Sequence, residues 1–179
     1  KTYYDTPDFF FADRGINISI IAVGASRELV IRYDGNQVNR IEFLKDIPNY
    51  FKIKIAKDEP ITKYVAEITE AIYRVFPTGL NVNIEEMINQ SSPQIKVLKK
   101  RESYRVVNNI GLKTVMSFDN CEYVNVKNKG KYSQPTLDVV CEASTRKEDF
   151  EIFLKTIVRD YPQLIKIDSN ELSVARSNL

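Results

Sequence analysis

Hydrophobic and polar positions along the chain follow two periods, one of two residues and one close to that of an α-helix. In residues 50–56 the alternation is strict, so that Lys52 and Lys54 share one face and the apolar residues share the other. Similar runs of β-branched and aromatic residues predict further strands at 16–23, 28–33, 37–44, 94–100, 103–108, 112–118, 121–126 and 136–143. Short polar turns separate several of them, and we expect one of these turns at Asp119-Asn120.

Two longer segments carry apolar residues at helical spacing. The first follows Asp58, which is the expected N-cap, and Pro77 marks its end. The second follows Thr145, which would form a capping box with Glu148. Both segments are therefore expected to be amphipathic helices that lie against an apolar surface.

The order of elements predicts an α+β fold: strands, a helix, more strands, a second helix and a tail. A shorter helix is expected at 83–90, and residues 165–179 are expected to form a strand or a short helix. Closure of a sheet removes its exposed edges. About eight antiparallel strands with few linkers therefore predict a closed β-barrel with the helices packed outside. The length of 179 residues fits one domain, 1–179, without an evident boundary.

The composition narrows the classes of function. A net charge of +2 gives no protein-wide basic field, so no DNA binding is evident. No apolar run of about 18 residues predicts a membrane span. Cys121 and Cys141 are expected to be free thiols of a cytoplasmic protein, although a disulfide between them is an open alternative. The chain has no histidine, which excludes Ser-His-Asp and Cys-His catalysis within it.

The N-terminal segment carries a more specific signal. Residues 3–8 read YYDTPD, and Arg-Gly-Ile follows at 14–16. This resembles the signature of the CYTH family of triphosphate tunnel proteins, in which YYDTPD leads into a short helix and then G-I-x-L-R-x-R. Further segments resemble family strands in the same order, with K-x-R-x-x-Y at 99–104, S-L-D-x-V-E at 117–122, and less specific matches at 29–32, 137–142 and 176–179.

The resemblance implies a tunnel of eight antiparallel strands that binds triphosphate or polyphosphate compounds. A triphosphate carries about four negative charges, and a low-dielectric tunnel strengthens its attraction to fixed cations. Carried onto this sequence, the phosphate-binding candidates are Arg32, Lys52, Lys54, Lys99, Arg101 and Arg176. The candidate ligands for Mg²⁺ or Mn²⁺ are Asp119, Asp138 and Glu142. The simpler alternative is that these strand residues are solvated surface charges and that Asp119 is a turn residue.

The sequence also departs from the family pattern. No E-x-E-x-K strand precedes Tyr3, so that strand is expected either upstream of Lys1 or to be missing. Both arginines of L-R-x-R are replaced, by Ser19 and Ile21. Three functions therefore remain open. One is a divergent triphosphate- or polyphosphate-binding domain that acts as a metal-dependent phosphohydrolase. Another is an inactive anion-binding or protein-interaction module, and an unrelated small β-barrel module is a third, weaker alternative.

Overall fold

The computed structural model describes residues 1–33, 50–75, 80–107, 112–142, 145–164 and 171–179, and it divides into two compact units. The first unit comprises residues 1–97, 123–131 and 171–179, and the second comprises 98–122 and 132–170. The long strand β5 (Ser92–Val107) passes from the first unit into the second without a break. The single domain expected from the sequence stays a prediction.

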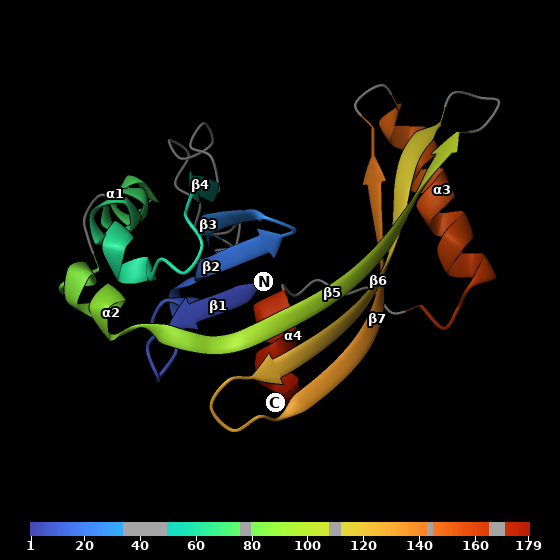
Figure 1. Cartoon of the computed structure of the whole chain (residues 1–179). Coiled ribbons are helices and arrows are strands. Elements are labelled where there is room, and N and C mark those ends of the chain that lie inside the picture. Colours follow the sequence, from blue (N-terminus) through green and yellow to red (C-terminus); the bar gives the residue numbers. More distant parts are fainter. Residues whose placement is uncertain (34–49, 76–79, 108–111, 143–144, 165–170) are drawn as a thin grey trace. The chain divides into compact units, whose positions relative to one another are not determined.

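Seven strands form one antiparallel sheet within the described residues, in the order β4-β3-β2-β1-β5-β6-β7 (Figure 1). Besides β5, they are β1 (Thr2–Asp5), β2 (Ile16–Val23), β3 (Ser26–Tyr33), β4 (Tyr50–Lys54), β6 (Lys113–Asn125) and β7 (Lys131–Cys141). Because β4 and β7 end this order, the expected closure into a barrel is not confirmed. The strand expected at 37–44 lies outside the described residues.

Four α-helices and two short 3₁₀ segments accompany the described part of the sheet. The first unit contains η1 (Ala12–Arg14), η4 (Ile61–Tyr64), α1 (Val65–Val75), α2 (Ile84–Gln90) and α4 (Glu171–Asn178). The second contains α3 (Lys147–Asp160). Within the described residues, no helix is both long enough and apolar enough to cross a membrane.

The first unit has a core between one face of β2, β3 and β4 and the helices α1 and α2. Every second residue of these strands points into the core. Ile18 of β2 and Leu29 of β3 are among them, and Ile68 and Ile72 of α1 belong to the same core. Each of these four side chains is at most 2% exposed. Burial of one such side chain stabilises a fold by roughly 1.5–3 kcal/mol. This unit is therefore held mainly by its apolar core.

Two polar side chains accept hydrogen bonds from backbone N–H groups at the start of helical segments. Asp5 follows β1, and its carboxylate accepts hydrogen bonds from the backbone N–H groups of Thr6, Phe11 and Ala12, at 2.8, 3.0 and 2.9 Å. The YYDTPD segment therefore ties the end of β1 to the 3₁₀ segment η1. Asn83 caps α2 by accepting a hydrogen bond from the Glu86 N–H at 3.2 Å.

The capping predictions at Asp58 and Thr145 are wrong. Asp58 has a φ of 66° and does not begin a helix; η4 begins at Ile61 after Pro60. Glu59 stabilises this turn instead, because its carboxylate accepts a bond from the Ala56 N–H. Thr145 does not cap α3 either, since its hydroxyl bonds the N–H and the carbonyl of Lys113, both at 2.8 Å.

The turn expected at Asp119-Asn120 is also wrong. Residues 113–125 form the single strand β6, and residues 94–108, expected as two strands, fall largely within β5. Asp119 lies inside β6 and is buried. Its charge is tolerated there because Lys99 and Arg101 of β5 neutralise it.

Candidate functional site

One face of β5 carries a row of polar side chains in the second unit. Lys99, Arg101, Ser103 and Arg105 occupy every second position and therefore share this face. We call these four residues the β5 row. The structure pairs them with side chains of β6, of β7 and of Glu142, the residue that follows β7, all in the same unit. The three cations of the row meet three carboxylates, on Asp119, Asp138 and Glu142.

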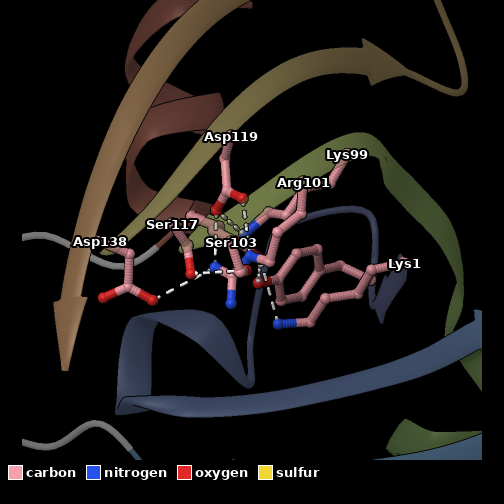
Figure 2. Close-up of polar contacts among 9 residues, drawn as sticks. Lys1, Lys99, Arg101, Ser103, Ser117, Asp119 and Asp138 are labelled. Carbon is pink, nitrogen blue, oxygen red and sulfur yellow. Dashed lines mark hydrogen bonds and ion pairs between the residues drawn. The ribbon is translucent and has the colours of Figure 1, made fainter. Parts of the chain in front are cut away.

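Asp119 lies next to Lys99 and Arg101, as Figure 2 shows. Arg101 donates from its Nε to Oδ1 at 2.7 Å and from a terminal nitrogen to Oδ2 at 2.6 Å, and Lys99 Nζ lies 3.2 Å from Oδ2. The Asp119 side chain is only 2% exposed. A bidentate arginine–carboxylate pair is among the stronger polar contacts in proteins. The hydrogen bonds from Arg101 hold the pKa of Asp119 below its ordinary value, and the same pair raises the pKa of Arg101.

Two further ion pairs connect β5 with β7 and with Glu142, the residue directly after β7. Arg101 also donates to Asp138 Oδ2 at 3.2 Å, and Arg105 forms a bidentate pair with Glu142 at 2.7 and 2.9 Å. Both pairs join residues 37 positions apart, so the two contacts repeat along the strands. Hydrogen bonding to Arg105 lowers the pKa of Glu142. These pairs differ from the Asp119 contact in being open to solvent, with Arg105 62% and Asp138 46% exposed.

A pair of hydroxyl groups lies between the arginines. Ser103 Oγ of β5 is 2.9 Å from Ser117 Oγ of β6, and either group can donate. Ser117 is buried, so this bond satisfies a polar group that has left water. The β5 row therefore makes three charged contacts and one neutral contact, and the neutral contact lies between those of Arg101 and Arg105.

The other candidate cations lie in the first unit. Arg32 on β3 and Lys54 on β4 are exposed. Lys52 Nζ lies 3.8 Å from Glu28 Oε2 and 5.4 Å from the centre of the Tyr50 ring. In α4, Arg176 pairs with Asp13 at 2.7 Å and lies over the ring of Phe9.

Five of the nine candidate residues thus belong to the three-strand cluster in the second unit, namely Lys99, Arg101, Asp119, Asp138 and Glu142. Sequence reasoning missed Arg105 and Ser103. The two-residue period that begins at Lys99 and Arg101 was the signal that could have found both.

The three carboxylates have the hard oxygen donors that Mg²⁺ and Mn²⁺ prefer. Asp119, however, already accepts bonds from two cations, and Asp138 and Glu142 each accept bonds from an arginine. No group of three or more His, Cys, Asp or Glu side chains in the described part of the chain could hold a metal ion. As arranged here, the cluster does not fit a resident metal, and the metal site stays a prediction.

Comparison with known proteins gives a match at the level of the fold. No protein-family model matches the chain, and no curated protein matches it. Among solved structures, a proposed adenylate cyclase (bh2851) from Bacillus halodurans is similar over 96% of this chain and 78% of its own, with a TM-score of 0.55 and 10% identity. At that identity, the likeness concerns the fold alone.

Proposed function

We propose that this chain is a divergent tunnel-type domain that binds triphosphate or polyphosphate anions through the cations of the β5 row. The observation that carries the proposal is the alignment of Lys99, Arg101 and Arg105 on one face of one strand. Fold similarity to a proposed adenylate cyclase of the CYTH type supports a tunnel-like domain coarsely. The proposal includes closure of the strands into a tunnel around the β5 row.

Both arginines retain donors for an added anion. A guanidinium has five N–H donors. Arg101 donates one from Nε and two from a single terminal nitrogen to Asp119 and Asp138, and this leaves both N–H groups of its second terminal nitrogen. Arg105 binds Glu142 along one edge in the same manner. The opposite edge of each guanidinium can therefore receive phosphate oxygens.

The buried carboxylate of Asp119 supports this role by fixing the cations on either side of it. Arg101 is held by two bonds to Asp119, so less side-chain freedom is lost when an anion binds. Because every carboxylate of the cluster is bound to a cation, we propose binding that does not require a metal ion. Binding without turnover is also consistent with the replacement of both family arginines, at Ser19 and Ile21.

Calorimetric titration of the protein with sodium tripolyphosphate tests the proposal, with and without Mg²⁺ or Mn²⁺. We expect binding in both conditions and about tenfold weaker binding by Arg105→Ala, since hydrogen bonds to charged groups contribute roughly 1.5–3 kcal/mol before solvent screening. Lys100→Ala is the matched control, because Lys100 lies on the opposite face of β5 and is 79% exposed. No binding by the wild-type protein, or equal losses in the two variants, would contradict the proposal.

A metal-dependent phosphohydrolase is the second candidate. Asp138 of β7 and Glu142, which follows the end of β7, both lie beside the cations, which is the observation in its favour. Phosphate release from tripolyphosphate in the presence of Mn²⁺, abolished by Glu142→Gln, would establish this activity. Mn²⁺-independent binding without release would favour the binding domain.

A further inference from the structure

We propose that Asp138 and Glu142 determine which anions the β5 row accepts, because they already occupy its two arginines as built-in competitors. The inference rests on the proposed function and names what sets its specificity. A carboxylate presents two oxygens to a guanidinium much as a phosphate does. Glu142 makes both of these contacts on Arg105, and Asp138 makes one on Arg101.

Asp119 cannot act in the same way. Its side chain is 2% exposed and is held by two cations, so an anion arriving from solvent does not replace it. Asp138 and Glu142 are 46% and 28% exposed, and exposed ion pairs are weak and are screened by salt. These two carboxylates are therefore the ones that an incoming polyanion displaces.

The charges of the cluster explain why displacement of Asp138 and Glu142 affects the binding of an anion. Lys99, Arg101 and Arg105 are matched in number by the carboxylates of Asp119, Asp138 and Glu142, so the intact cluster has no excess positive charge to attract an anion. When Asp138 and Glu142 are displaced, Arg101 and Arg105 lose two of the carboxylates that neutralise them, and more of the positive charge of the row is available to the anion. An anion on the free edge of a guanidinium still faces this neutralised cluster, and it gains the full attraction only when it also displaces the carboxylate of Asp138 or Glu142.

The spacing of the two competitors then selects for size. Asp138 lies in β7 and Glu142 directly follows its last residue, so the two are four residues apart, which corresponds to about 13 Å of extended chain. One orthophosphate exchanges at a single arginine and gains little over the carboxylate that it replaces. An anion with several linked phosphates exchanges at both arginines in one binding event, which raises its effective concentration at the second. The row should therefore discriminate against single phosphates.

The test compares tripolyphosphate and orthophosphate binding by wild-type protein, Asp138→Asn, Glu142→Gln and the double variant. We expect each single substitution to tighten tripolyphosphate binding about two- to fivefold, the range for losing one exposed ion pair. The gains should multiply in the double variant, in which orthophosphate binding should also become measurable. Glu102→Gln is the matched control, since it removes one negative charge from the opposite face of β5.

Each outcome of these titrations either supports or overturns the inference. Tighter binding in both single variants with an unchanged Glu102→Gln supports the inference. Tripolyphosphate binding that is equal in all proteins overturns it and leaves the proposed function standing. An equal gain in Glu102→Gln also overturns it, because the effect would then be one of net charge alone. If neither the wild-type protein nor any variant binds tripolyphosphate, the proposed function itself fails.

Discussion

Two buried aspartates, one in each unit, meet the cost of burying a carboxylate in different ways. Asp5 in the first unit is 2% exposed, and among the described residues its carboxylate is bonded only by neutral groups, namely backbone N–H donors and the Thr6 hydroxyl. Asp119 in the second unit is 3% exposed and is bonded by Arg101 and Lys99. Burial raises the pKa of Asp5 despite its bonds, whereas the bonds from Arg101 lower the pKa of Asp119.

The difference separates a structural carboxylate from one in a candidate site. Neutral donors are enough to connect β1 with η1, and they place no charge near solvent. The cations around Asp119 are partly exposed, with Lys99 32% and Arg101 43% accessible, so they offer charge to a ligand. A buried carboxylate with exposed cationic partners is therefore the arrangement expected of an anion-binding surface.

The largest effect is expected at Asp5. The Asp5→Ala substitution leaves the N–H groups of Phe11 and Ala12 without their acceptor, together with that of Thr6. Each buried donor without a partner costs about 1–3 kcal/mol. We expect the free energy of unfolding, measured by urea denaturation, to fall by about 3 kcal/mol or more. Asp8→Ala, at an exposed position of the same segment, should change it by less than about 1 kcal/mol.

Replacing Asp119 should have a smaller effect on stability than replacing Asp5. Asp119→Asn removes the charge that Lys99 and Arg101 bind, but both cations are partly exposed and can turn to water. We expect a loss of about 1–3 kcal/mol in the free energy of unfolding, below the 3–5 kcal/mol typical of a fully buried pair. Asp138→Asn is the control and should cost less than about 1 kcal/mol. Equal losses in the two variants would show that burial of Asp119 is not what matters.

The two aspartates should also respond to pH in opposite directions. The pKa of Asp119 is lowered in the folded protein, so its contribution is complete above about pH 3.8 and is lost as the pH falls toward the folded pKa. The pKa of Asp5 is raised, so its contribution is complete below about pH 3.8 and is lost as the pH rises through the folded pKa.

Urea denaturation between pH 3 and 7 measures both effects. As the pH falls, the stability difference between wild type and Asp119→Asn should shrink. The difference between wild type and Asp5→Asn should shift in favour of the wild type over the same range. Parallel curves for the two variants would contradict the contrast between these sites.

The sequence predicted best where the physical cause is local. The alternation of residues 50–56 and the short helix expected at 83–90 depend on near neighbours, and the structure has β4 at Tyr50–Lys54 and α2 at Ile84–Gln90. The turn at Asp119-Asn120 was wrong because Asp119 is neutralised by cations 18 and 20 positions earlier in the chain, which turn propensity does not register. Thr145 likewise bonds Lys113, 32 residues away, instead of its own helix.

The candidate site was predictable in part for the same reason. Residue identity and family resemblance pointed to Lys99, Arg101 and the three carboxylates. That these opposite charges bind one another depends on how β5, β6 and β7 align, which their spacing in sequence does not determine. Arg105 fits the two-residue period that begins at Lys99. It was not selected because the K-x-R-x-x-Y motif of the family ends at residue 104.

The smallest effect is expected at Ser103, the neutral member of the row. Ser103→Ala leaves the buried Ser117 hydroxyl without this partner, which should lower the free energy of unfolding by about 1 kcal/mol. Tripolyphosphate affinity should stay within about twofold of wild type, because the charges on Arg101 and Arg105 are unchanged. Urea denaturation and calorimetry of the same preparation measure both quantities. A large loss of affinity without a loss of stability would make the hydroxyl a ligand contact, and the row would then bind anions through hydrogen bonding at Ser103 as well as through its cations.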